Sequence, residues 1–215
     1  MTTTLGRGVS ATMTTRGRES AGVTGGSPVV HTTVSSPLGD LLLVGVERPD
    51  LPAGFALAGL SWLVGQPKAV RPQATWRAAR EPFAPVTAQL EEYFAGRRRT
   101  FDLPVWTSGS AFQERVWQAL ETIPFGTTTT YGALAARIGT GRTDARAIGT
   151  AVGANPLLLI RPCHRVIGAD GNLRGFAAGL DRKDYLLRHE GALGTFLDLP
   201  PRIPAPARAS AAPSG

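Results

Sequence analysis

The sequence is poor in the residues that form disulfides and bind metals. Only one cysteine, Cys163, and three histidines occur among the 215 residues. One cysteine excludes an intramolecular disulfide, which is typical of proteins of the reducing cytoplasm. The cysteine and histidines also lack the spacing of a zinc site, so we expect no metal.

Long apolar segments are missing as well. No run approaches the roughly 20 apolar residues that a membrane-spanning helix needs. The N-terminus is rich in Thr, Gly and Ser and has no apolar core of a secretory signal. We therefore expect a cytoplasmic protein with no membrane partner.

Acidic residues are outnumbered by basic ones. The chain has 23 Lys and Arg against 16 Asp and Glu, a formal net charge of +7. This balance favours a polyanion such as nucleic acid as partner. Part of the excess stands near the two ends of the chain, where solvated, disordered charge explains it better than a binding surface: Arg7, Arg16, Arg18, Arg202 and Arg208.

The composition along the chain predicts two folded domains between two disordered tails. Residues 1–28 and the Pro/Ala-rich residues 196–215 have too few large apolar side chains to offset the entropy of ordering. Within the first domain, 29–104, short apolar runs at 29–35, 41–47 and 56–64 predict a small antiparallel sheet. A four-residue apolar period predicts a helix over 82–95.

The second domain, 105–195, is expected to be helical. Apolar spacing predicts a helix over 108–123, and two short helices, 131–138 and 143–152, follow around a glycine turn. Their lengths are those of a helix-turn-helix, although many helical hairpins share them. Small residues such as Ala145 and Gly149 permit close approach of either a packed helix or DNA. The fold class is therefore α/β, of the α+β kind.

The surroundings of Cys163 indicate a nucleophile. The run 158–161 before it reads as a strand, Pro162 restricts the chain, and His164 and Arg165 add potential positive charge that favours thiolate over thiol. A lone cysteine is otherwise often an inert core residue.

The run Pro162-Cys163-His164-Arg165-Val166 resembles the active-site signature of the O6-alkylguanine-DNA alkyltransferases. The similarity is dense over residues 112–191. It implies a ribonuclease H-like first domain and a helix-turn-helix that enters the minor groove of double-stranded DNA bearing alkylated guanine. It also implies a monomer without cofactor, which transfers one alkyl group irreversibly to its own cysteine.

The resemblance assigns a role to each catalytic group. Cys163 is the nucleophile, His164 takes the thiol proton through a bound water, and Glu190 orients His164. Glu190 falls at the end of a helix that Gly191 stops, an unfavourable place for a carboxylate, so a compensating partner is expected in any case. Tyr131 assists rotation of the nucleotide and bonds to the flipped guanine.

Further roles concern DNA and the guanine pocket. Arg146 fills the space of the extruded base, with Ala145 and Gly149 beside it, and Asn155 is a hinge between helix and active-site segment. The guanine pocket is assigned to Val166, Phe176, Ala177 and Lys183. Two positions depart from the family pattern: Arg161 replaces an apolar residue, with solvent or phosphate as its expected surroundings, and Ala178 replaces a glycine, which adds a methyl to the pocket loop.

Two other functions fit parts of the sequence. A cysteine hydrolase would use the same Cys, His and Glu with turnover, but it does not need Tyr131 and Arg146. A non-catalytic protein that recognises alkylated DNA would not need Cys163. The sequence favours alkyl transfer over both, and it leaves the range of alkyl groups open.

Overall fold

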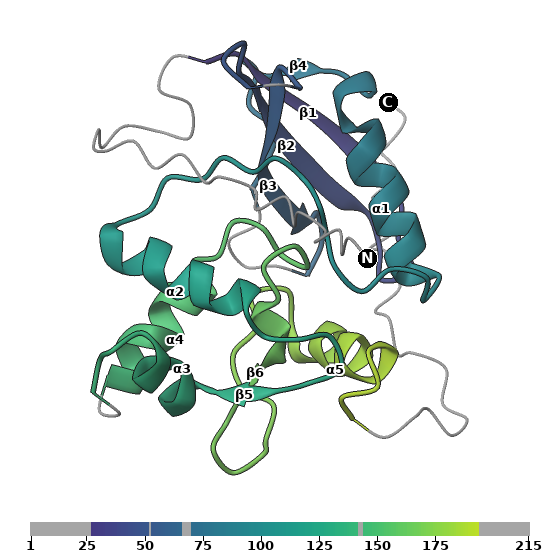
Figure 1. Ribbon diagram of the computed structural model, residues 1–215. Coiled ribbons are helices and arrows are strands. Elements are labelled where there is room, and N and C mark those ends of the chain that lie inside the picture. The colour runs from purple at the N-terminus through teal and green to yellow at the C-terminus, as the bar shows by residue number, and fades with distance from the viewer. Residues whose placement is uncertain (1–26, 52, 66–69, 142–143, 194–215) are drawn as a thin grey trace, which may run out of the picture.

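The computed structural model describes residues 27–51, 53–65, 70–141 and 144–193. The two tails expected from the sequence lie almost entirely outside these residues. Figure 1 shows a sheet flanked by one helix, and next to it a group of helices formed by the second half of the chain. No described helix is long and apolar enough to cross a membrane.

The sheet has the strand order β3-β2-β1-β4. Strands β1 (Val29–Val34), β2 (Leu41–Glu47) and β3 (Phe55–Trp62) are antiparallel neighbours and match the runs predicted from the sequence. A two-residue strand, β4 (Arg77–Ala78), pairs in parallel with β1. The sequence did not indicate β4, because two residues are too short for a period to be seen.

Helix α1 (Ala84–Phe94) covers one face of the sheet (Figure 1). A short 3₁₀ helix, Glu81–Phe83, leads into it, with Pro82 at a position where a missing backbone N–H costs nothing. Val86, Leu90 and Tyr93 form the buried stripe of α1. The helix predicted over 82–95 is thereby confirmed to within two residues.

The sheet is buried on both faces. Leu41 and Leu43 belong to the main core under α1, whereas Leu42 and Val44 belong to a second cluster, against which Trp76 and Trp106, among others, pack. Because successive side chains of a strand point to opposite faces, an unbroken apolar run such as 41–44 indicates this double burial.

The free edge of β3 holds two segments from outside the sheet. Leu57 bridges to Val105, and Leu60 bridges to Leu157. The Leu60 N–H donates to the Pro156 carbonyl at 2.9 Å, and the Leu158 N–H donates back to the Leu60 carbonyl at 3.1 Å. The first domain thus fixes the chain five residues before Cys163.

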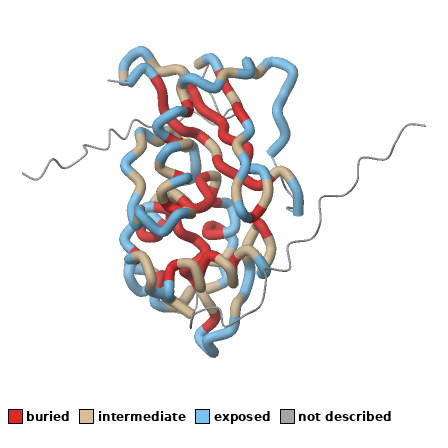
Figure 2. Tube along the Cα trace, turned by 90° about the vertical axis from the view of Figure 1, so that its right-hand side faces the viewer, coloured by how far each residue is buried: buried red, intermediate tan, exposed pale blue. Residues whose placement is uncertain are grey.

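The second half contains helices α2 (Ala111–Glu121), α3 (Tyr131–Arg137), α4 (Ala145–Gly153) and α5 (Leu180–His189). Strands β5 (Thr129–Thr130) and β6 (Val166–Ile167) pair in parallel beside them. The helices predicted over 108–123, 131–138 and 143–152 are confirmed, with ends shifted by at most three residues. Figure 2 shows that the buried stretches run from the sheet continuously into this half.

Candidate active site

The segment before Cys163 forms tight turns, so the strand predicted over 158–161 is wrong. Leu159 has a φ of 70°, a left-handed conformation that a strand does not contain. The Arg161 N–H donates a hydrogen bond to the Leu157 carbonyl at 2.9 Å, which closes a turn. An apolar run of this length signals burial but does not distinguish a strand from a buried turn. Cys163 then begins a single turn of 3₁₀ helix, Cys163–Arg165.

Asn155 holds these turns together from within. Its Nδ2 donates to the carbonyls of Leu157 at 3.3 Å and Arg161 at 2.9 Å, and it contacts the Sγ of Cys163 at 3.2 Å. Its Oδ1 accepts from the Leu157 N–H at 3.0 Å. Asn155 is buried, so the structure places it against the nucleophile and not on a DNA-facing surface.

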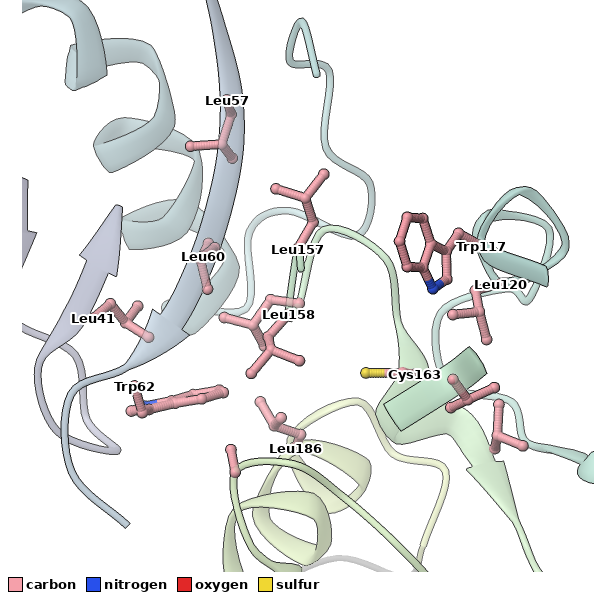
Figure 3. Packing of buried hydrophobic residues seen from close by; sticks show 14 of the residues in the cluster. Leu41, Leu57, Leu60, Trp62, Trp117, Leu120, Leu157, Leu158, Cys163 and Leu186 are labelled. Carbon is pink, nitrogen blue, oxygen red and sulfur yellow. The ribbon is translucent and has the colours of Figure 1, made fainter. Parts of the chain in front are cut away.

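The sulfur of Cys163 lies in an apolar environment. The residue is 2% exposed, and its sulfur points toward the side chains of Leu158 and Leu186 (Figure 3). Burial raises the pKa of Cys163 to about 11, although the Asn155 amide and the Lys183 charge oppose the shift. The expectation that neighbouring charge favours the thiolate is therefore wrong for the protein without DNA. Desolvation dominates, and Cys163 is a thiol there.

His164 points toward Glu190, which lies 26 residues further along the chain. The Nε2 of His164 is 2.9 Å from Oε1 of Glu190, and both side chains are fully buried. Burial alone would raise the pKa of Glu190, but the hydrogen bonds from His164 and Arg165 outweigh it and hold that pKa well below its usual range. Burial also lowers the pKa of His164, against the opposing effect of Glu190. At neutral pH the pair is a carboxylate and a neutral imidazole.

This pairing selects the tautomer of His164. A carboxylate only accepts hydrogen bonds, so the network assigns the proton to Nε2 and leaves Nδ1 with a free lone pair. Nδ1 is buried and has no hydrogen-bond partner among the described residues. The geometry therefore presents a buried base next in sequence to a buried thiol.

Two further side chains that donate to Glu190 were not indicated by the sequence. Arg165 donates from Nε to Oε2 at 2.7 Å and from Nη2 to Oε1 at 2.9 Å. The hydroxyl of Tyr93, on α1 of the sheet domain, donates to Oε1 at 2.8 Å. Arg165 stands in the quoted motif, but no signal pointed to Tyr93, which was hidden among the core positions of a helix 97 residues away.

Tyr131 and Lys183 meet at one backbone carbonyl. Tyr131 is the first residue of α3, where the Thr130 side chain caps the helix by accepting from the Ala133 N–H. Its hydroxyl donates to the carbonyl of Arg174 at 3.1 Å. The Nζ of Lys183 donates to the same carbonyl and to that of Val166, each at 2.6 Å. Burial lowers the pKa of Lys183 to about 8.

The remaining pocket candidates follow in the loop before α5. Phe176 and Ala177 are half-buried, and the Phe176 ring packs near both Trp62 and His164. Val166 is fully buried, and its carbonyl is already occupied by Lys183. Ala178 is buried in the main core, so the structure places its added methyl among packed side chains.

Arg146 stands on the outer side of α4. It is exposed, whereas Ile148 and Val152 of the same helix are buried. Ala145 and Gly149 are half-exposed, and a Cβ on Gly149 would lie 3.9 Å from the ring of Tyr131. One surface therefore carries Tyr131 and the small residues of α4.

Arg161 contradicts the expectation that it faces solvent or phosphate. Its side chain is 1% exposed and donates from Nε to Glu121 Oε1 at 2.8 Å and from Nη1 to Thr107 Oγ1 at 2.9 Å. Its guanidinium also lies 5.2 Å from the Trp117 ring centre. A charge is stable at this depth because helix α2 supplies a carboxylate partner.

No group of three or more metal-ligating side chains occurs among the described residues.

Comparisons with known proteins place nearly all of the described part of the chain in one protein family. The profile of the 6-O-methylguanine DNA methyltransferase ribonuclease-like domain matches residues 29–107, and that of the DNA-binding domain matches residues 111–192. A methylated-DNA–protein-cysteine methyltransferase of Methanosarcina acetivorans is 43% identical over 157 residues, 73% of this chain and 95% of the relative.

A protein of the same name from Mycolicibacterium paratuberculosis is 42% identical over 175 residues, 79% of this chain and 99% of the relative. Among solved structures, Mycobacterium tuberculosis OGT in complex with DNA superposes with a TM-score of 0.67 at 40% identity. That superposition covers 76% of this chain and 93% of the other.

Proposed function

The chain belongs to the 6-O-methylguanine DNA methyltransferase family, the methylated-DNA–protein-cysteine methyltransferases, and on this premise we propose how its own residues carry out the reaction. The protein repairs DNA by moving an alkyl group from O6 of guanine to the Sγ of Cys163. One observation carries the assignment: a buried thiol stands next to a buried His–Glu pair whose free imidazole nitrogen is basic.

The thiol must lose its proton before or during the attack. Because burial keeps the pKa of Cys163 at about 11, a neutral solution alone supplies little thiolate. His164 Nδ1 takes the proton, through one water molecule, while Glu190 holds the imidazole by Nε2. Glu190 stays ionised throughout and stabilises the imidazolium that forms.

The sulfur then displaces guanine from the alkyl carbon. A carbon–sulfur bond forms, the carbon–O6 bond breaks, and guanine leaves with the electron pair and takes up one proton, which balances the proton that His164 removed from the thiol. Neither water nor His164 readily cleaves the resulting thioether, so each molecule reacts once. Cofactors have no part in these steps.

DNA must deliver the guanine out of the stack, because Cys163 is buried. We propose that α3 and α4 act as a helix-turn-helix in the minor groove. In this arrangement Arg146 fills the vacated space, and the small residues Ala145 and Gly149 allow α4 to approach the groove walls. Tyr131, on the same surface, assists the rotation of the nucleotide.

The flipped guanine is read by the segment from Val166 to α5. Backbone groups at Cys163, Val166 and Ala177 bond its edge, and Phe176 borders the alkyl position. Lys183 holds the Val166 and Arg174 carbonyls in place beside Tyr131. Asn155 fixes the turn that carries Cys163. The molecule acts as a monomer in the cytoplasm, and its ribonuclease H-like domain supports the site from behind.

The test is the mass of the peptide that contains Cys163 after incubation with duplex DNA carrying one O6-methylguanine. We expect a gain of one methyl group, with at most one equivalent per protein. The Cys163→Ala variant should bind the methylated duplex and gain nothing.

Other outcomes point elsewhere. Tight binding of the lesion without any mass gain indicates a damage-recognition protein with an idle cysteine. Release of more than one equivalent of product indicates a hydrolase. Methyl transfer by the Cys163→Ala variant would overturn the assignment of the nucleophile.

A further inference from the structure

The sheet domain contributes one polar group to the buried His–Glu pair. Tyr93, near the end of α1, is 1% exposed, and its hydroxyl donates to Glu190 Oε1 at 2.8 Å. The same oxygen accepts from His164 Nε2 at 2.9 Å. The phenol and the imidazole therefore share one acceptor atom, although they come from different domains.

The position of the phenol is rigid because rings enclose it. The rings of Phe94, Phe101, Phe125 and His189 lie with their centres between 5.1 and 6.3 Å from that of Tyr93. The His189 Nε2 also contacts the Tyr93 carbonyl at 2.8 Å, so backbone and side chain are both fixed against the end of α5. A donor held this firmly loses little entropy in making its hydrogen bond.

Several charged or titratable groups surround the pair. Arg165 binds both oxygens of Glu190, and the Gly126 N–H lies 3.4 Å from Oε2. From α5, the charge of Lys183 lowers the pKa of His164, and Tyr185 raises the pKa of Tyr93. Cys163 stands on the chain next to His164. Arg165 already balances the charge of the Glu190 carboxylate. The phenol of Tyr93 therefore adjusts how strongly Glu190 accepts hydrogen bonds, and it does not decide whether Glu190 is ionised.

We propose that Tyr93 is a positioning residue for the transfer reaction: its hydroxyl draws electron density from Glu190 Oε1 and so limits how strongly that oxygen holds the Nε2 proton of His164. This inference rests on the proposed function of the site. It gives the sheet domain a part in setting the basicity of the histidine, in addition to supporting the fold.

The physical consequence has a definite sign. Without the hydroxyl, Oε1 keeps two donors, His164 and Arg165, and becomes a stronger acceptor. A stronger acceptor at Nε2–H stabilises the imidazolium, so the pKa of His164 rises. The imidazole is then protonated, and inactive as a base, at a higher pH than in the wild-type protein.

The experiment compares single-turnover methyl transfer between pH 5.5 and 9 in three proteins. Tyr93→Phe keeps the ring and removes only the hydroxyl. Gln89→Leu is the matched control on the same helix, since Gln89 bonds the Asp102 backbone at 2.8 and 2.9 Å and does not touch Glu190. An NMR titration of the His164 imidazole, without DNA, gives a second readout that does not depend on transfer.

For Tyr93→Phe we expect the acid limb of the rate profile and the His164 titration to move up together by about 0.5 to 1 pH unit, on the scale of part of one charged hydrogen bond. Transfer well below the wild-type midpoint falls by about 3- to 10-fold, and transfer at pH 8.5 stays within about 2-fold. Gln89→Leu lowers stability to denaturant without moving either midpoint.

Superimposed midpoints for Tyr93→Phe and wild type, or an equal shift in Gln89→Leu, would overturn the proposal. Failure of the proposed function gives a different result. In that case wild type transfers no methyl group at any pH, while the NMR titration still decides whether Tyr93 sets the basicity of His164.

Discussion

Arg161 is a buried charge that depends on partly exposed partners. Its side chain is 1% exposed, whereas the side chain of Glu121, its nearest carboxylate, is 40% exposed, and Glu114 lies 3.9 Å away. The two members of such a pair are not equivalent. Removing the carboxylate leaves a buried cation short of a partner, while removing the arginine leaves carboxylates that water can reach.

We therefore expect substitution of Glu121 and substitution of Arg161 to lower the free energy of unfolding by different amounts. Glu121→Ala should lower the free energy of unfolding by about 1–3 kcal/mol. Arg161→Leu, which fills the space with an apolar side chain, should change it by less than about 1 kcal/mol. Urea unfolding at pH 7 measures both. An equal loss in the two variants would show that the pair contributes as a unit and that burial of Arg161 is not the cause.

At the scale of elements, α4 combines a closely packed inner side with a small-residue outer side. Ile148, Ala151 and Val152 are buried, and the Ala151 carbonyl accepts from Trp117 Nε1 of α2 at 2.8 Å. The helix is therefore anchored without its outer residues, and substitution of Arg146 there should leave the fold unchanged.

Arg146→Ala is expected to impair flipping more than chemistry. The side chain is exposed and lies apart from the buried thiol, so it acts only where a base must be displaced from a stack. Transfer from duplex DNA should fall by about 10-fold or more, the scale of one lost contact of about 1.4 kcal/mol, while reaction with the free base O6-methylguanine stays within about 2-fold.

The control for Arg146→Ala is Arg71→Ala, which removes the same charge from an exposed position in the sheet domain. It should leave transfer from duplex DNA nearly unchanged. Equal losses on duplex and free base in Arg146→Ala would contradict the role of the side chain in flipping.

Elements in which the apolar pattern continues over many residues could be predicted from the sequence, and short or irregular elements could not. The strands over 29–34 and 41–47 and the helices of both halves followed from period and flanking Pro or Gly. The turns before Cys163 were mistaken for a strand because residues 157–159 are apolar through burial, although only Leu157 bridges to β3. Within the site, the family resemblance assigned His164 and Glu190, but Tyr93 joins them only through tertiary packing, which no local pattern records.

At the scale of the whole molecule, the site lies where the two halves of the chain meet. The β3 edge holds the segment before Cys163, and α1 supplies Tyr93. Arg182 of α5 donates from Nε to the Leu38 carbonyl at 3.0 Å, which adds a contact on the other side. Groups that titrate at this junction therefore affect the stability of both halves together.

Acid should destabilise the molecule in two steps. The pKa of His164 is lower in the folded than in the unfolded state because of burial, and the pKa of Glu190 is lower because His164 and Arg165 bond to it despite burial. In both cases the unfolded chain binds a proton that the folded chain does not, so stability rises with pH and is lost as pH falls.

The loss begins below the ordinary histidine pKa of about 6.5 and steepens below the ordinary glutamate pKa of about 4.3. Each proton contributes a slope of up to about 1.4 kcal/mol per pH unit. Urea unfolding at pH 7.5, 6, 5 and 4 measures the profile. In His164→Gln the slope between pH 6.5 and 5 should decrease, because that side chain no longer titrates, while the step below pH 4.5 remains. A wild-type free energy of unfolding that is constant from pH 7.5 to 5 would contradict a buried, neutral His164, and with it the base on which transfer to Cys163 depends.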